Sequence, residues 1–213
     1  MSRSEVLEPI IAGVSVIPVV VLDNAADAVP LATALVAGGL RVIEITLRTG
    51  AALEAIKAIA GEVEGAVVGA GTVLSKGQFV AAEKAGARFA VSPGVGPDVL
   101  AAAADSVIPL MPGAATASEV MTLMDEGYTI QKFFPAEPAG GLAYLKAFSA
   151  PLPDISFCPT GGIDLRNAPA YLALPNVVCV GGSWVAPKEA IAAGDWSRIE
   201  RLARDAAALG RAA

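Results

Sequence analysis

Apolar residues recur along the chain in short runs that alternate with segments of a different pattern. Each run is rich in β-branched side chains and ends near glycine, proline or a polar residue, which is typical of buried strands. Eight such runs begin at Ser15, Leu40, Ala66, Phe89, Val107, Thr129, Ile155 and Val177. Their spacing of about 23 residues is close to the ~25 expected when eight strand–helix units share a chain of this size. The pattern therefore predicts a repeated strand–helix unit.

Alanine-rich segments with a helical pattern separate these runs. In residues 51–62, for example, Leu53, Ile56 and Ala60 are spaced to share one face of a helix. Further helices are predicted over residues 4–11, before the first strand, and over residues 196–209, after the last.

Strands that are apolar along their length suit a parallel sheet whose faces are covered by helices. Eight units predict an α/β fold, a single (β/α)8 TIM barrel over residues 1–213 with an additional N-terminal helix. An open, doubly wound sheet is the alternative that this pattern leaves. In a barrel the chemistry lies at the C-terminal ends of the strands, so polar residues at those ends become candidates.

Lys132 is the one lysine that falls inside an apolar strand run. Alternation places it on the same strand face as Ile130 and Phe134. Burial disfavours the ammonium form of a lysine, and a neutral amine attacks carbonyl carbon, so this position suits a Schiff-base lysine. A lysine that reaches past the barrel rim or pairs with a carboxylate is the structural alternative.

Two further charged candidates, Glu44 and Arg48, share one face of the strand predicted from the second apolar run. Ile43 and Ile45 are expected to face the helices, so Glu44 should point into the barrel. Glu44 is then a candidate general acid–base, and a buried ion pair that only stabilises the fold is the alternative. Arg48 lies nearer the rim, where its guanidinium group could bind a carboxylate.

The composition narrows the chemistry that these residues can perform. The 213 residues are 54% apolar and include two cysteines and no histidine. The lack of histidine excludes serine–histidine triads, cysteine–histidine dyads and zinc sites built on imidazole, and two cysteines are too few for a four-cysteine zinc site. Cys158 and Cys179 fall in predicted strands and are expected to be small buried core residues.

Two glycine pairs follow the last two predicted strands, Gly161-Gly162 and Gly181-Gly182, and Ser183 follows the second pair. Glycine lets backbone N–H groups approach an anion closely, and these two loops of a barrel commonly hold phosphate. The formal net charge of −6 makes nucleic acid and anionic membranes poor partners. Because no run resembles a spanning helix or a signal peptide, we expect a cytoplasmic protein.

Seven segments carry a resemblance that extends in order over nearly the whole chain. They are ALVAGGLRVIEITLRT (34–49), VVGAGTVL (67–74), FAVSPG (89–94), IPLMPG (108–113), KFFPAE (132–137), FCPTGGI (157–163) and VCVGGSWV (178–185). Together they resemble the 2-keto-3-deoxy-6-phosphogluconate (KDPG) aldolases of the class I, Schiff-base type. This resemblance implies a homotrimer of (β/α)8 barrels that cleaves the phosphorylated keto acid to pyruvate and D-glyceraldehyde 3-phosphate without a metal or other cofactor.

Carried over position by position, the resemblance also implies a role for each candidate residue. Lys132 would form the Schiff base and Glu44 would act as the general acid–base. Arg48 and Thr72 would bind the carboxylate of the substrate. The remaining members would be the pocket residues Pro93, Phe134 and Thr160 and the phosphate-binding residues Gly161, Gly162 and Ser183.

Several rival functions stay open at this point. An aldolase of the galactonate series in the same family would act on the C4 epimer, and the sequence does not distinguish the two. Activity on 4-hydroxy-2-oxoglutarate is expected as well, because Arg48 and Lys132 would contact only the pyruvoyl half. A phosphosugar isomerase or epimerase would need no strand lysine, and a non-catalytic phosphosugar-binding barrel would tolerate loss of Glu44.

Overall fold

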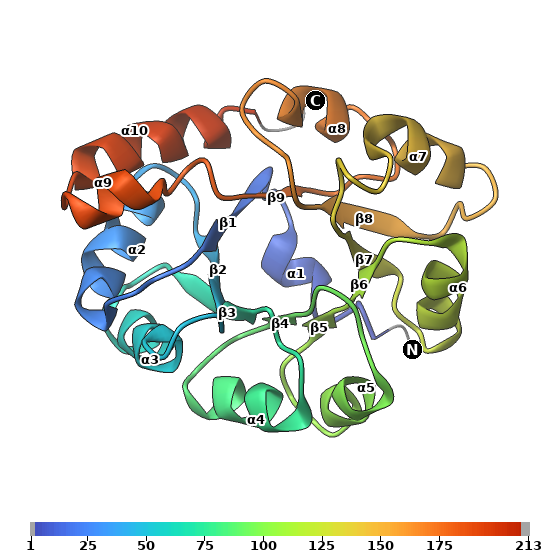
Figure 1. Ribbon diagram of the computed structural model, residues 1–213, viewed down its shortest axis with the longest axis horizontal. Coiled ribbons are helices and arrows are strands. Elements are labelled where there is room, and N and C mark those ends of the chain that lie inside the picture. The colour runs from blue at the N-terminus through green and yellow to red at the C-terminus, as the bar shows by residue number, and fades with distance from the viewer. Residues whose placement is uncertain (1–2, 210–213) are drawn as a thin grey trace.

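The structure, a computed structural model that describes residues 3–209, consists of parallel strands surrounded by helices (Figure 1). The strands are β1 (Val16–Val20), β2 (Val42–Thr46), β3 (Val67–Gly71), β4 (Ala90–Val91), β5 (Leu110–Met111), β6 (Gly113–Ala114), β7 (Ile130–Phe133), β8 (Ser156–Pro159) and β9 (Val180–Gly182). The helices are α1 (Glu8–Ile11), the 3₁₀ helix η1 (Ala25–Asp27), α2 (Ala28–Ala37), α3 (Ala52–Glu62), α4 (Lys76–Lys84), α5 (Pro97–Ala104), α6 (Ala117–Asp125), α7 (Gly141–Phe148), α8 (Ala168–Leu172), α9 (Lys188–Ala192) and α10 (Trp196–Ala207).

All of the strand pairs in the described residues are parallel. One sheet has six strands in the order β5-β4-β3-β2-β1-β9, and a second has three in the order β6-β7-β8. Isolated bridges pair Phe157 with Val177 and Thr160 with Gly181, which brings β8 beside the segment that ends in β9. The predicted α/β class with parallel strands is therefore confirmed.

The strand predicted to begin at Val107 is wrong in its extent, because the structure divides this segment into β5 and β6. Pro112 lies between them and has no N–H to donate to a neighbouring strand. The segment changes partner at this residue, since β5 pairs with β4 whereas β6 pairs with β7. The carbonyl of Pro112 still accepts a hydrogen bond from the backbone N–H of Lys132 at 2.8 Å.

Alternation along the strands separates two apolar cores. The larger core lies between the strands and the helices and includes Ile43 and Ile45, as predicted. The smaller one, which we call the inner cluster, contains Leu7, Ile11, Val14, Ile17, Val42, Phe89, Val91, Met111, Ile130, Cys158 and Cys179. Figure 1 shows α1 in the middle of the ring of strands, where Ile11 contributes to this cluster. Both cysteines are buried in this cluster, which confirms their prediction as core residues.

The terminal helices are shorter than predicted. Helix α1 begins at Glu8 and not at residue 4, and Pro9 occupies its first turn. Proline is tolerated there but breaks a helix when it lies further inside, so the helix cannot begin a turn earlier. Helix α10 begins at Trp196 as predicted and ends at Ala207.

The predicted apolar face of α3 is confirmed at Ile56 but wrong at Leu53 and Ala60, which are exposed. Ala52, Ala55, Ile56 and Ile59 are the buried residues, whereas Leu53 is exposed. The two small alanines let the helix approach the strands closely, so the larger Leu53 lies outside the contact. Among residues 3–209, no helix is long and apolar enough to cross a membrane.

Candidate active site

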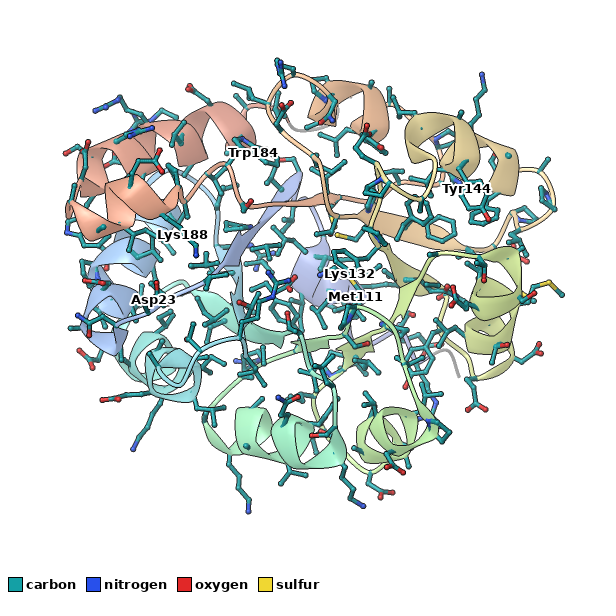
Figure 2. The ribbon with its side chains drawn as sticks, in the orientation of Figure 1. Asp23, Met111, Lys132, Tyr144, Trp184 and Lys188 are labelled. Atoms are coloured by element: carbon teal, nitrogen blue, oxygen red, sulfur yellow. The ribbon has the colours of Figure 1, made fainter. Side chains whose placement is uncertain are left out.

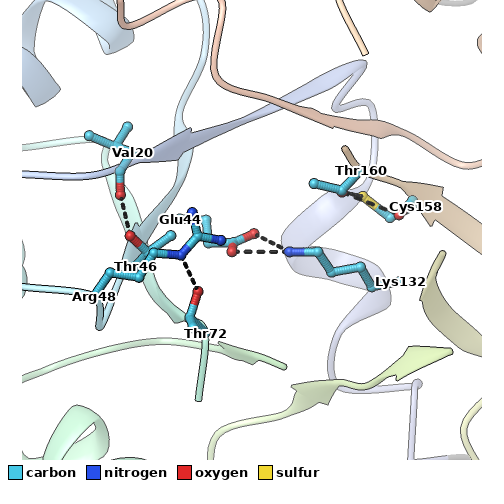
Figure 3. A network of polar contacts seen from close by, with 8 residues as sticks. All are labelled: Val20, Glu44, Thr46, Arg48, Thr72, Lys132, Cys158 and Thr160. Carbon is cyan, nitrogen blue, oxygen red and sulfur yellow. Dashed lines mark hydrogen bonds and ion pairs between the residues drawn. The ribbon is translucent and has the colours of Figure 1, made fainter. Parts of the chain in front are cut away.

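The side chains of Lys132 and Glu44 meet inside the ring of strands. The Nζ atom of Lys132 lies 3.2 Å from Oε1 and 3.4 Å from Oε2 of Glu44, and both residues are buried (Figure 3). Lys132 comes from β7 and Glu44 from β2, so 88 residues of sequence separate the two partners. The alternative in which this lysine reaches past the barrel rim is therefore wrong. Its carboxylate partner is Glu44.

Gly71, at the end of β3, provides the space for this carboxylate. A Cβ atom at Gly71 would lie 2.1 Å from Oε1 of Glu44 and 2.5 Å from its Cγ, so no larger residue fits without displacing Glu44. The register pairs Gly69, two residues earlier, with Glu44 itself. Sequence analysis missed Gly71, although a glycine at the end of an apolar strand signals close approach of another group.

Arg48 and Thr72 lie together at the C-terminal ends of β2 and β3. The Nε atom of Arg48 donates a hydrogen bond to Oγ1 of Thr72 at 3.1 Å (Figure 3). The backbone φ of Thr72 is 56°, in the left-handed region that threonine rarely adopts. A strained backbone of this kind is held in place by its surroundings and points to a functional position. The two residues assigned to the carboxylate are therefore adjacent, and the guanidinium group keeps N–H donors for a ligand.

A cavity of about 780 Å³ opens at this end of the strands. Six of the predicted site residues line it, namely Arg48, Phe134, Thr160, Gly161, Gly162 and Ser183. The Nζ atom of Lys132 lies 5.5 Å from the centroid of the Phe134 ring, so the buried ion pair is next to the cavity. Loops that follow β1, β2, β7, β8 and β9 contribute to the lining.

The structure places Pro93 and Thr160 on either side of β7. Pro93 follows β4 and packs on Gly113, since a Cβ at Gly113 would lie 2.3 Å from the carbonyl carbon of Pro93. Gly113 is paired in register with Lys132, so Pro93 is close to the lysine without lining the cavity. Thr160 packs on Gly181, where a Cβ would lie 2.2 Å from Oγ1 of Thr160.

Asp23, Lys188 and Trp184 also line the cavity, and sequence analysis did not select them (Figure 2). Asp23 and Lys188 are exposed, and neither makes an ion pair within the described residues. A Cβ at Gly182 would lie 1.6 Å from the Trp184 ring, so the second glycine pair makes room for this indole. These residues carry no sequence signal of their own, because they meet only where loops after different strands converge.

The buried pair of Lys132 and Glu44 thus adjoins a cavity lined by the guanidinium group of Arg48 and by the glycine loops. Among residues 3–209, no three Asp, Glu, Cys or His side chains lie close enough together to hold a metal ion. A buried lysine in contact with a carboxylate, beside a cavity with a guanidinium group and glycine loops, can form a carbinolamine with a ketone and move protons around it.

The sequence comparisons identify the family. Residues 7–202 match the sequence profile of the KDPG and KHG aldolases. The chain belongs to this family. A 2-dehydro-3-deoxy-phosphogluconate aldolase of Pseudoalteromonas atlantica is 55% identical to it over 193 residues, which cover 91% of this chain and 90% of the relative. The resemblance that the sequence motifs carry is thus confirmed, and the chain is a member of a family of lyases.

Solved aldolase structures show the same fold. The KDPG aldolase of Legionella pneumophila, captured with pyruvate as a covalent carbinolamine, superimposes with a TM-score of 0.91 and 46% identity over 99% of both chains. The KDPG aldolase of Zymomonas mobilis ZM4 with 3-phosphoglycerate gives a TM-score of 0.92 and 46% identity, again over 99% of both chains. The similarity therefore extends over nearly the whole chain.

Proposed function

We propose that this chain is a class I aldolase that cleaves 2-dehydro-3-deoxy-6-phosphogluconate to pyruvate and D-glyceraldehyde 3-phosphate. The observation that carries the proposal is the buried contact of Lys132 with Glu44 beside the cavity. The names of the relatives and the carbinolamine of the Legionella enzyme support the same chemistry. The gluconate series is favoured over the galactonate series, because the similar relatives carry the gluconate name.

The reaction begins with Lys132. Glu44 takes a proton from its ammonium group across the 3.2 Å contact, which leaves a neutral amine and a carboxylic acid. The Nζ atom then attacks C2 of the keto acid and forms a carbinolamine. Glu44 returns the proton to the C2 hydroxyl, which departs as water, and an iminium ion remains.

Cleavage follows from the positive charge of this iminium ion. The Glu44 carboxylate, directly or through one water, takes the proton of the C4 hydroxyl. The C3–C4 bond then breaks, C4 becomes the carbon of the product aldehyde, and the bonding electron pair forms an enamine at C3. Glu44 delivers its proton to C3, and hydrolysis of the new iminium releases pyruvate and the free lysine.

The rest of the site orients the substrate over Lys132. Arg48 and Thr72 bind the carboxylate next to C2, because the guanidinium group matches a carboxylate with two parallel hydrogen bonds. Gly161, Gly162 and Ser183 also line the cavity, and we assign the phosphate to their backbone N–H groups. Phe134, Thr160 and Pro93 shape the space around the imine.

The mechanism uses no metal or other cofactor, because the iminium ion stabilises the developing carbanion. Addition of a chelator should leave turnover unchanged. The same enzyme should also split 4-hydroxy-2-oxoglutarate, since Lys132, Glu44 and Arg48 act only on the pyruvoyl half. A lower kcat/KM is expected for that substrate, because it lacks a phosphate for the glycine loops to bind.

We also propose, on the same family basis, that residues 1–213 form one domain in a closed (β/α)8 barrel and that three copies associate in the cytoplasm. The bridges from Thr160 and Phe157 to the β9 segment support the closure. Light scattering in solution should give a trimer mass, and unfolding should show one cooperative transition.

Reduction of the imine tests the catalytic proposal directly. Pyruvate and borohydride should add an irreversible mass increment to the protein, and peptide mapping should place it on Lys132. Lys132→Met should give no adduct, whereas Lys146→Met on the outer helix α7 should give the full one. An isomerase, an epimerase or a binding protein would give no adduct, and an adduct on another lysine would refute the proposed role of Lys132.

A further inference from the structure

Glu137 and Tyr171 form a contact directly behind the first glycine pair. The Tyr171 hydroxyl donates a hydrogen bond to Oε1 of Glu137. Tyr171 belongs to α8 and is fully buried, and Glu137 follows β7 at the end of the segment 132–137. Neither residue lines the cavity, so neither is placed to touch the substrate.

The stem of Glu137 packs tightly on Gly162. A Cβ at Gly162 would lie 2.6 Å from Cγ and 2.7 Å from Cβ of Glu137. The φ values of Gly161 and Gly162 are 101° and 82°, so both residues are in the left-handed region and form a local turn. Any displacement of the Glu137 side chain would therefore change the space in which this turn is held.

Hydrogen bonds fix the carbonyl oxygens of the same turn. The backbone N–H of Glu137 donates to the carbonyl of Gly161 at 3.0 Å. The Nδ2 atom of Asn167 donates to the carbonyl of Gly162 at 2.9 Å. With both carbonyl oxygens engaged by protein donors, the turn can offer its N–H groups to an anion in the cavity.

The Tyr171 hydroxyl also determines where the Glu137 carboxylate lies. A free carboxylate beside a phosphate site would repel a phosphate dianion. Burial and the neighbouring Glu137 carboxylate raise the pKa of Tyr171, so its hydroxyl stays protonated and continues to donate. Gly141, at the start of α7, also packs close to this contact, since a Cβ at Gly141 would lie 3.1 Å from the Tyr171 hydroxyl oxygen.

We propose that Glu137 and Tyr171 are a positioning pair that holds the Gly161-Gly162 turn in the conformation that binds the phosphate of the substrate. This inference rests on the proposed function and adds to it two residues that act on substrate affinity without contact to the substrate. Part of the affinity for phosphate would then depend on Tyr171 of α8, which lies behind the turn and does not line the cavity.

Tyr171→Phe tests the pair, because it removes one oxygen and keeps the ring. Steady-state kinetics should compare the phosphorylated keto acid with the same keto acid without its phosphate. We expect KM for the phosphorylated substrate to rise about fivefold to tenfold, the effect of one lost hydrogen bond, with kcat within twofold. KM for the unphosphorylated substrate should not change. Calorimetric titration with inorganic phosphate should show a matching loss of affinity.

Rescue and control variants separate positioning from a general loss of structure. Glu137→Gln keeps an acceptor oxygen for the tyrosine and should stay within twofold of the natural protein, whereas Glu137→Ala should behave as Tyr171→Phe. Tyr144→Phe makes the same chemical change on α7, where the ring stacks on Phe133, and should leave both KM values unchanged.

The outcomes distinguish this inference from the proposed function. Equal changes of KM on both substrates, or no change of KM and phosphate affinity in Tyr171→Phe, would overturn the positioning pair. If the natural protein cleaves neither substrate and forms no pyruvate adduct, the proposed function fails. The phosphate titration would then still decide whether the pair holds the turn.

Discussion

Gly69 and Gly71 lie two residues apart on β3 and face two different layers of the interior. A Cβ at Gly69 would lie 2.4 Å from the ring of Phe89, which belongs to the inner cluster. A Cβ at Gly71 would lie 2.1 Å from the carboxylate of Glu44. The same residue type on the same face of one strand therefore makes room for a core side chain in one layer and for a candidate catalytic group in the other.

The two layers differ in what closes them. The apolar layer is the inner cluster, to which Leu7 and Ile11 belong. Helix α1 lies in the middle of the strands and covers this layer (Figure 1). The polar layer, which contains Glu44 and Lys132, adjoins the cavity at the C-terminal ends of the strands. Two strands contribute to both layers, since Val42 and Ile130 belong to the inner cluster and Glu44 and Lys132 follow them on the same face. The role of an inward-facing residue therefore depends on its position along the strand, and not only on the face that it occupies.

We expect the largest effect from replacing Glu44, the proposed proton carrier of the polar layer. Glu44→Gln keeps the shape of the side chain, but an amide cannot take up and return a proton. We expect kcat to fall by about 10²- to 10⁴-fold, the usual contribution of a general acid–base. Pyruvate should still be trapped on Lys132 by borohydride, more slowly than in the natural protein. Turnover close to normal would remove Glu44 from its proposed role.

The second prediction moves Glu44 without changing it. Gly71→Ala brings a methyl group against its carboxylate, which must shift away from Lys132. A displacement of this size should lower kcat about 100-fold. Gly61→Ala is the matched control, because nothing lies within 4 Å of a Cβ at that position on α3. Equal kcat values for the two variants would mean that the contact with Gly71 does not position the carboxylate.

The third prediction makes the same substitution in the apolar layer. Gly69→Ala forces the Phe89 ring out of its packed position, and overpacking of a core costs about 1–3 kcal/mol in the free energy of unfolding. Chemical denaturation should show this loss, while kcat of the folded protein should change less than in Gly71→Ala. If Gly69→Ala lowers kcat as strongly as Gly71→Ala, the two glycines do not have the different roles proposed for them.

The smallest effect is expected at the outer rim of the cavity. Lys188 is exposed, so its attraction for the substrate phosphate is screened by water and salt. Lys188→Gln should raise KM for the phosphorylated substrate about threefold at low salt, and less at high salt. Lys84→Gln at the end of α4 removes the same charge away from the cavity and serves as the control. A salt-independent change in KM would point to a contact other than charge.

Much of the fold and of the candidate site could be predicted from one-dimensional patterns. Period-two alternation predicted that Ile43 and Ile45 face the helices and that Glu44 faces inward, because successive side chains of a strand point to opposite sides. The position of a single lysine inside an apolar strand run identified Lys132 as the candidate Schiff-base residue. The motifs predicted the family, which the comparison with known aldolases confirmed.

Other features depended on contacts that no local pattern contains. The buried face of α3 follows its small alanines because the approach of the helix to the strands favours them over Leu53. The division of β5 from β6 depends on which neighbour each half finds on either side of Pro112. Trp184 and Tyr171 were missed for the same reason.

By itself, the sequence determined which groups the protein could use. With no histidine present, acid–base chemistry is left to Asp, Glu, Lys, Tyr or Cys, and the strand positions of Glu44 and Lys132 made these two residues the candidates. The tertiary structure alone decided that Glu44 lies 3.2 Å from Lys132 and that Gly71 leaves space for it. The physical reason is that residue type and alternation are properties of one segment, whereas a distance between β2 and β7 exists only after packing has brought these strands together.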